Sequence, residues 1–290
     1  MLQADSARNR QIGIAMISVA TLCFTALDTT AKWLVVSLPV VQVVWLRFLT
    51  HSLLGMAVLA PSYGMRLFRV NQPGLQLLRG LILSMLTGLN FWALVYLQLD
   101  VTGAIQFSTP ILIAMLSARW LGERLDGRRW LAILVGFGGV LLIVRPGSHA
   151  FHPAIILSLL NAVLYAVFNL LTRRLAASDL PAATQLLSAI VATVVLTPFG
   201  LLNWKTPGDW RMWVLILVMG LLGGIGHLMA AQAHRYASAA VLGPFLYQQI
   251  IYMSFFGWLV FGHLPDAAVV GGAAIVVVSG LYLLYREFRR

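Results

Sequence analysis

Three charged side chains, Asp28, Lys32 and Arg47, stand in stretches of the sequence that are otherwise apolar. Asp28 and Lys32 are four residues apart, so on a helix they share one face and can pair. Arg47 falls in the next apolar stretch, where Asp28 is the acid best placed to neutralise it, and we expect a structural ion pair. Lys32 can equally extend its ammonium to the polar edge of an apolar layer. Asp28, Lys32 and His227 are also the candidates for proton coupling.

Uncharged polar residues recur with helical spacing in two apolar stretches. Thr21, Thr25 and Thr29 follow one another at intervals of four, and so do Asn161, Tyr165 and Asn169. Because residues at i, i+4 and i+8 lie on one helix face, each set forms a polar stripe. We expect the two stripes to line a common cavity, while the alternative is hydrogen bonding that holds helices together.

Other apolar stretches contribute further polar and aromatic residues. Such side chains could line a pocket for an amphipathic organic molecule. The complete set of substrate-binding candidates is Thr25, Asn90, Trp92, Gln106, Asn161, Tyr165, Asn169, His227, Tyr247 and Gln248. Pro110 removes a backbone donor and is expected to kink its helix.

Motifs for catalysis are not found in the sequence. There is no phosphate-binding G-x-x-x-x-G-K-[ST] loop, no H-E-x-x-H motif and no G-x-S-x-G elbow. Glycines at 220, 223, 224 and 226 lie in an apolar stretch, where close helix packing is the expected role. The six histidines lack metal-ligand spacing, and the single Cys23 allows no internal disulfide. We therefore expect no catalytic residue, metal or cofactor, and an enzyme is not supported.

The composition indicates what surrounds these residues. Of 290 residues, 60% are hydrophobic and 10% are charged, whereas a soluble domain has roughly 25% charged residues. The chain therefore has too little charge to cover a surface in water. Its net charge of +11 does not favour nucleic acid, because the arginines form short clusters between apolar stretches. Such clusters are typical of cytoplasmic loops in membrane proteins.

Apolar stretches long enough to cross a bilayer, roughly 20 residues each, recur along the whole chain. They predict an all-α polytopic membrane protein of ten transmembrane helices, because barrel strands would be shorter and alternating. The predicted spans are 12–35, 40–60, 74–97, 101–121, 128–145, 153–173, 181–202, 210–233, 238–261 and 266–285. The first span is too long for a signal peptide and is expected to be retained.

Basic residues predict the orientation of the spans. Lys and Arg in short loops mark the cytoplasmic side, and most of the 20 Lys and Arg residues, Arg79 included, fall on one side if ten helices are counted. We therefore expect a multi-pass protein of the bacterial inner membrane with both termini in the cytoplasm. Residues 1–11 and 286–290 would be cytoplasmic tails.

The chain repeats itself after 140 residues, the shift that brings Tyr96 onto Tyr236 and Gly80 onto Gly220. The same shift aligns every predicted helix boundary of residues 12–145 with one of residues 152–285. Each half then has five helices, and an odd number forces the second half into the opposite orientation. Substrate sites of such inverted repeats lie near the midplane. The alternative is a duplication that built only a scaffold.

The first half carries a recognisable pattern: Tyr96 to Ala104, Ser108-Thr109-Pro110, Trp120 to Arg124, and Gly136 with Gly138-Gly139. It resembles the EamA repeat of the drug/metabolite transporter superfamily, over essentially the whole chain. The second half resembles a degenerate copy in which His263 replaces a glutamate and Ile250 a proline. Within the superfamily the chain looks most like YddG-type aromatic amino-acid exporters. The motif residue Glu123 is interpreted as structural.

The resemblance implies two inverted EamA repeats around a central cavity and export without ATP hydrolysis. We expect a secondary transporter that exports aromatic or apolar amino acids, or related metabolites, by alternating access. The alternatives are a broad-specificity drug exporter, a channel, or an intramembrane enzyme. Expected partners are a small-molecule substrate and membrane lipids, and no nucleic acid. Small residues in spans 128–145 and 266–285 could pack a homodimer, and otherwise a monomer is expected.

Overall fold

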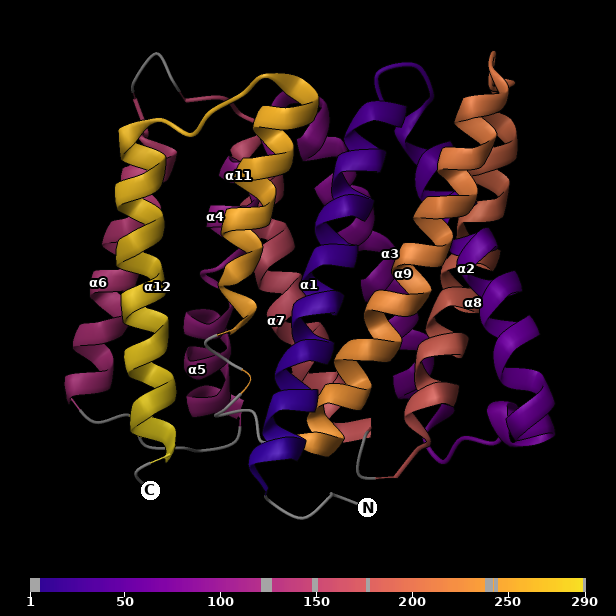
Figure 1. The fold of residues 1–290 in the computed structure, drawn as a ribbon, viewed down its shortest axis with the longest axis horizontal. Helices are drawn as coiled ribbons and strands as arrows, with labels where there is room; N and C mark the ends of the chain where they lie inside the picture. Colours follow the sequence, from indigo (N-terminus) through magenta and orange to yellow (C-terminus); the bar gives the residue numbers. More distant parts are fainter. Residues whose placement is uncertain are drawn as a thin grey trace.

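The computed structural model describes residues 6–120, 127–147, 151–175, 178–237, 242 and 245–288, and every regular element in them is a helix (Figure 1). The α-helices are α1 (Ala7–Leu34), α2 (Val40–Tyr63), α3 (Pro73–Tyr96), α4 (Leu99–Gln106), α5 (Thr109–Trp120), α6 (Gly127–Val144), α7 (Ile155–Leu175), α8 (Pro181–Leu202), α9 (Trp210–Tyr236), α11 (Gln248–Phe261) and α12 (Ala267–Phe288). A 3₁₀-helix, η1 (Gly64–Phe68), follows α2.

Six of these helices are long and apolar enough to cross a membrane, and four shorter apolar helical stretches complete ten spans. Helices suit lipid because they satisfy every backbone hydrogen bond within the segment. Their ends carry the expected signals: the Ser6 side chain accepts from the Asn9 amide at 3.2 Å, and Pro73 and Pro181 open α3 and α8. Gly262 ends α11 with φ of 69°, a left-handed conformation that suits glycine. The predicted all-α fold is confirmed.

Several predicted spans differ from the helices at their ends. The span predicted at 101–121 is two helices, α4 and α5, separated at Phe107 and Ser108. Pro110 is the second residue of α5, a position where its missing N–H costs nothing. Pro61 lies inside α2, which continues to Tyr63 although the span was predicted to end at residue 60. In the span predicted at 238–261, residues 238–241 and 243–244 lie outside the described part.

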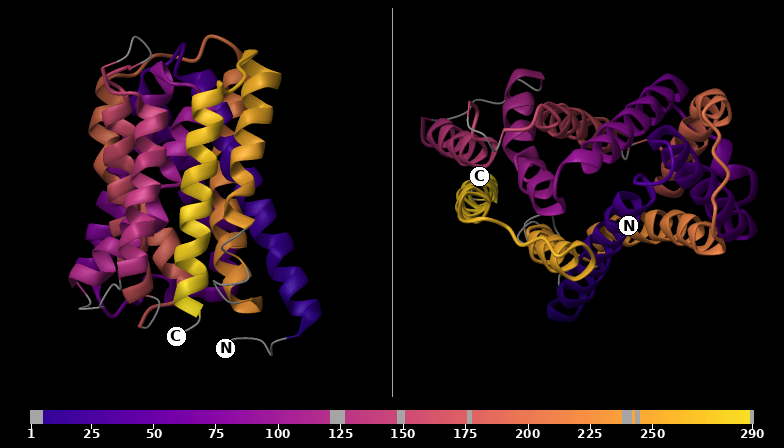
Figure 2. Two further views of the ribbon diagram at one scale, coloured as in Figure 1. Left: turned by 90° about the vertical axis from the view of Figure 1, so that its left-hand side faces the viewer. Right: turned by 90° about the horizontal axis from the view of Figure 1, so that it is seen from above.

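The helix pairs obey the internal repeat. Helix α1 packs on α9, and its counterpart α7 packs on α3, which is the counterpart of α9. In the same way α2 packs on α9, and its counterpart α8 packs on α3. The pairs α6–α12 and α2–α8 join corresponding helices and lie at opposite ends of the bundle (Figure 2). Exchanging the two halves therefore reproduces the contacts, as the internal repeat requires. The start of α1 and the end of α12 lie at the same edge (Figure 1).

Small residues bring corresponding helices close together. Gly139 of α6 faces Gly272 of α12, whose carbonyl oxygen would lie 2.8 Å from a Cβ at residue 139. Nearby, the Ser279 hydroxyl donates to the Ala132 carbonyl at 2.5 Å. These contacts use the small-residue faces of α6 and α12 within one chain, the same faces that suggested a homodimer in the sequence.

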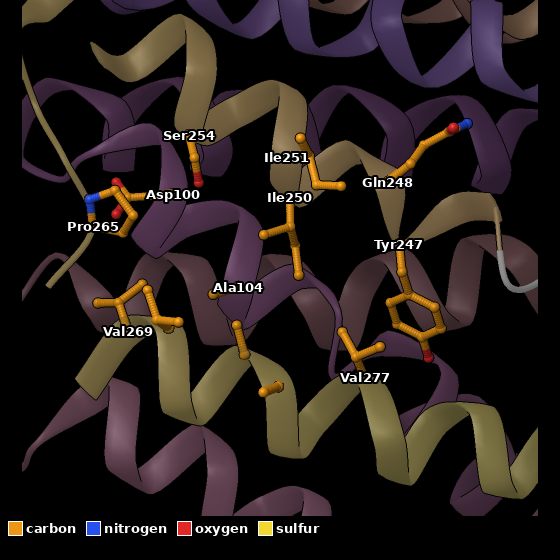
Figure 3. A pocket seen from close by; sticks show the side chains of 13 residues that line it. Asp100, Ala104, Tyr247, Gln248, Ile250, Ile251, Ser254, Pro265, Val269 and Val277 are labelled. Carbon is orange, nitrogen blue, oxygen red and sulfur yellow. The ribbon is translucent and has the colours of Figure 1, made fainter. Parts of the chain in front are cut away.

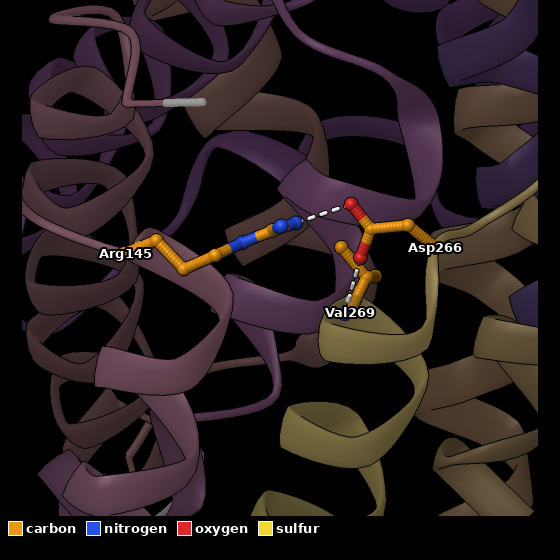
Figure 4. Close-up of polar contacts among 3 residues, drawn as sticks. All are labelled: Arg145, Asp266 and Val269. Atoms are coloured by element: carbon orange, nitrogen blue, oxygen red, sulfur yellow. Dashed lines mark hydrogen bonds and ion pairs between the residues drawn. The ribbon is translucent and has the colours of Figure 1, made fainter. Parts of the chain in front are cut away.

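An ion pair joins the end of the first half to the last helix (Figure 4). The Arg145 guanidinium, just after α6, pairs with the Asp266 carboxylate, just before α12. The same carboxylate accepts from the Val269 amide at 2.9 Å and so caps α12. The hydrogen bond from Arg145, followed by the one from Val269, holds the pKa of Asp266 below its usual range.

Candidate functional site

Three polar side chains from different helices lie at the centre of the bundle. Asp28 of α1, Tyr165 of α7 and His227 of α9 are deeply enclosed by protein, yet each keeps some accessible surface. Side chains that are deep in the bundle and still accessible are the ones that a substrate could reach. All three are candidates from the sequence, and they come from both halves of the chain.

Asp28 is oriented by a neighbour on α3. The Asn90 side-chain amide donates to Asp28 Oδ1 at 3.0 Å. Arg47 of α2 is only 4% exposed and lies close enough for its charge to act on Asp28. Within the described residues, however, neither a hydrogen bond nor an ion pair joins the two side chains, and Arg47 Nε and Nη1 have no hydrogen-bond partner. The expected direct ion pair is therefore not formed in this structure.

Lys32 turns away from Asp28. Its ammonium donates to the carbonyl oxygens of Leu94 at 2.8 Å and Leu97 at 2.6 Å and lies 5.5 Å from the Phe261 ring centroid. The two carbonyls belong to the C-terminal end of α3, where a positive charge is favourable. Lys32 thus joins α1 to α3 and does not pair with Asp28.

A second histidine accompanies His227. The His51 ring of α2 stacks on His227 with centroids 5.9 Å apart and an angle of 12°, and Phe24 meets His227 edge-on at 5.0 Å. His51 is 5% exposed and was not among the sequence candidates. The signal that could have identified His51 is its position as a polar residue within the apolar stretch 40–60.

Arg79 was also missed, because the sequence assigned it to the cytoplasmic side. It is instead fully buried in α3. Its Nε donates to the Thr172 hydroxyl at 2.8 Å and its Nη1 to the Ser188 hydroxyl at 2.6 Å, while the guanidinium carbon lies 4.1 Å from the Phe168 ring centroid. Arg79 therefore fastens α3 to α7 and α8.

The two polar stripes are mainly bonded to helix backbone. Thr25 is fully buried and its hydroxyl donates to the Thr21 carbonyl at 3.0 Å. Asn161 donates to the Leu86 carbonyl of α3, which is the interhelical hydrogen bond of the alternative interpretation. The Asn169 amide donates to the Tyr165 carbonyl at 2.7 Å. Of the two stripes, the Tyr165 side chain is therefore the member best placed to meet a substrate.

The remaining candidates lie outside this group. Trp92 is 50% exposed, and because it is two residues beyond Asn90 it faces the opposite side of α3. Gln106 ends α4. Tyr247 packs on Phe107 with ring centroids 5.4 Å apart. Gln248 donates to the Thr21 hydroxyl at 3.2 Å and so connects α11 to α1.

A groove of about 670 Å³ lies between α4, α11 and α12. Figure 3 shows Tyr247 and Gln248 near one end and Asp100, Ser254 and Pro265 near the other. The rest of its lining is aliphatic. Asp100, which the sequence did not single out, is 5% exposed, and its Oδ2 has no hydrogen-bond partner. Two of the sequence candidates, Tyr247 and Gln248, line the groove.

Within the described part of the chain, no group of three or more His, Cys, Asp or Glu side chains could hold a metal ion. The polar side chains described above include an acid, two guanidinium groups, two imidazoles and a phenol.

Ten helical spans in two inverted halves, with polar side chains enclosed between the halves, define a membrane transporter. The chain belongs to the EamA-like transporter family, which matches residues 11–145 and 152–286. It is therefore a transporter rather than an enzyme.

The chain is similar to transporters with several different substrates. It is 26% identical to an S-adenosylmethionine uptake transporter of Rickettsia bellii, over 98% of this chain and 97% of that protein. It is 29% identical to a riboflavin transporter of Vibrio cholerae, over 77% and 75%, and 26% identical to a pseudopaline exporter of Pseudomonas aeruginosa, over 93% and 95%. One solved crystal structure covers 99% of this chain with a TM-score of 0.65 and 19% identity, which shows a shared fold.

Proposed function

We propose that the protein is a secondary transporter that exports amino acids with aromatic or apolar side chains, or related metabolites, by alternating access. The observation that carries this proposal is the polar centre, where Asp28, Tyr165 and His227 come from both halves, lie deep in the bundle and each keep some accessible surface. An amino acid needs partners for two opposite charges, and Asp28 and Arg47 provide both signs there. Phe24, Tyr165 and the histidines offer aromatic surfaces for its side chain.

The relatives support a substrate with these features. S-adenosylmethionine is an amino acid that carries an aromatic adenine, and the riboflavin of another relative has an aromatic ring system. One of these relatives is an uptake transporter and another is an exporter, so the direction of transport has to be measured for this chain. The proposed substrate agrees with the sequence resemblance to aromatic amino-acid exporters of the YddG type.

We further propose the bacterial inner membrane as the location, with both termini in the cytoplasm. The support is the asymmetry of basic residues together with the common edge at which α1 begins and α12 ends (Figure 1).

Counterflow in proteoliposomes tests the function. Vesicles that contain the purified protein and unlabelled phenylalanine should accumulate labelled phenylalanine transiently and saturably, without electrical conductance. A pH gradient imposed in either direction shows whether protons are coupled and whether export is favoured. Conductance without counterflow would indicate a channel. Counterflow of cationic toxicants but of no amino acid would favour the drug exporter instead.

A further inference from the structure

We propose that Asp28 and Arg47 are the two poles of one binding site for the zwitterionic head group of an α-amino acid. The carboxylate of Asp28 takes the substrate ammonium, and the guanidinium of Arg47 takes the substrate carboxylate. This inference rests on the proposed function and specifies how the substrate is recognised.

Arg47 has the binding capacity that a carboxylate needs. Its side chain is 4% exposed, and Nε and Nη1 have no hydrogen-bond partner. A buried charged donor without an acceptor is costly, so a structure that keeps one has a use for it. The planar guanidinium binds a carboxylate through two parallel N–H bonds, and Nε with Nη2, which lie on the same edge, provides such a pair of donors.

Asp28 has the complementary capacity. A carboxylate offers about four acceptor positions, and the hydrogen bond from Asn90 at 3.0 Å uses one of them. That bond fixes the orientation of the carboxylate. Because Asp28 also keeps accessible surface deep in the bundle, an ammonium can reach the carboxylate.

The arrangement of the two charges distinguishes this site from a structural ion pair. Asp28 and Arg47 act on each other electrostatically, yet no direct bond joins them in the described structure. A zwitterion placed between them presents an opposite charge to each pole. Such a substrate brings no net charge into the low-dielectric centre, whereas a simple anion or cation would leave one pole uncompensated.

Gly223 brings the backbone of α9 close to Arg47. A Cβ at Gly223 would lie 3.3 Å from Leu27 Cδ1, 3.6 Å from Arg47 Nη2 and 3.8 Å from His51 Nδ1, so the glycine allows α9 to lie directly against both polar groups. His51 Nδ1 is itself without a hydrogen-bond partner. Lys32 and Arg79, by contrast, donate to acceptors of the protein, which leaves Arg47 as the buried base with the most free donors among the three.

The test uses substrate analogues that lack one charge. Phenylalanine, 3-phenylpropionate without the ammonium, and 2-phenylethylamine without the carboxylate compete against labelled phenylalanine in counterflow. The wild-type protein should bind phenylalanine at least tenfold more tightly than either analogue. Asp28→Asn should abolish the preference over 3-phenylpropionate and keep the preference over 2-phenylethylamine. Arg47→Gln should show the opposite pattern.

Control variants separate recognition from folding. Arg211→Gln removes an exposed charge outside the centre and should leave both preferences unchanged. Arg47→Lys keeps the charge but loses the paired donors, so it should lower the carboxylate preference even if Arg47→Gln fails to fold. The Asp28→Asn/Arg47→Gln double variant should lose both preferences.

Two outcomes would overturn the two-pole site while leaving the transporter intact. One is an equal loss for all three compounds in each single variant. The other is recovery of phenylalanine counterflow in the double variant, which a structural ion pair predicts. If the wild-type protein shows no counterflow of any amino acid, the proposed function itself is wrong.

Discussion

Three basic side chains within the first half of the chain differ in how their donors are paired. Lys32 donates to backbone carbonyls at the end of α3, and Arg79 donates to hydroxyls of α7 and α8. Arg47 has two nitrogens without a partner. Because a polar group already bonded to protein has little left to offer a ligand, the first two are structural and the third can bind substrate.

Lys32→Met should lower thermal stability without changing substrate selectivity. The substitution removes two hydrogen bonds from a charged donor, and such bonds contribute about 1.5–3 kcal/mol each when buried; partial exposure of Lys32 reduces this. We expect a clear drop in the unfolding temperature in detergent, smaller for Lys32→Arg, which keeps the cation near the carbonyls. A loss of amino-acid selectivity with unchanged stability would contradict this role.

Asp266→Asn should weaken the link between Arg145 and α12 in a pH-dependent way. Asparagine still caps a helix but lacks the charge, so the cost at neutral pH is that of an exposed ion pair, about 0–1 kcal/mol. Since the folded pKa of Asp266 is lowered, the stabilisation is complete above about pH 4 and is lost as the pH falls through the folded pKa. Unfolding temperatures of the two proteins should therefore converge in acid, and a constant difference would show that the charge is not responsible.

At the scale of helices, corresponding glycines make corresponding close contacts. A Cβ at Gly220 of α9 would clash with Thr50 of α2 and lie 3.0 Å from the His51 backbone nitrogen, and a Cβ at Gly80 of α3 would lie 2.6 Å from Val191 Cβ of α8. The internal repeat therefore extends to the packing of individual residues.

Gly220→Ala should destabilise the protein more than Gly80→Ala. The first substitution meets the Thr50 hydroxyl more closely than anything at Gly80 and the His51 backbone nitrogen at 3.0 Å, while the second meets Val191 Cβ at 2.6 Å and the Ser188 carbonyl oxygen only at 3.3 Å. Overpacking of this kind costs about 1–3 kcal/mol. Gly88 of α3 has no atom within 4 Å of its Cβ position, so Gly88→Ala is the matched control and should stabilise by about 0.5–1 kcal/mol. Thermal unfolding of the three variants tests this order, and equal effects would contradict the helix contacts described above.

The sequence predicted where the helices lie better than it predicted which side of each helix faces the interior. The ten spans and the inverted repeat follow from apolar length and from one register, and Pro110 signalled the interruption between α4 and α5. The directions of side chains did not follow, because a helix surrounded by lipid and protein is apolar on both sides. Trp92 and Asn90 are thus equally plausible cavity residues in sequence, and only the position of α1 shows that Asn90 faces inward. Arg79 was misassigned because its acceptors lie about a hundred residues away.

At the scale of the whole molecule, the two halves repeat the backbone but not the charges. Asp28, Arg47 and Arg79 all belong to the first half, and the corresponding residues of the second half are Phe168, Leu187 and Met219. The substrate poles are therefore fixed to one half while aromatic surfaces such as Tyr165 come from the other. The inward-open and outward-open states need not have equal energy, and this inequality can favour one direction of transport.

The orientation of the molecule can be tested by labelling cysteines introduced at exposed positions. Cys23 is the single cysteine and is buried, so the native chain serves as the background. Gly208→Cys lies between α8 and α9, and Met65→Cys replaces an exposed residue of η1. Five spans separate the two positions, so they should lie on opposite sides of the membrane.

A membrane-impermeant maleimide should label Gly208→Cys in intact spheroplasts and Met65→Cys only after permeabilisation. Labelling of the two variants with the sides exchanged would reverse the orientation and place both termini outside. Labelling of both from one side would mean that the number of spans between them is even, which the inverted repeat does not allow. Because a direction of transport has meaning only relative to a known orientation, this measurement also decides whether flux observed in cells is export.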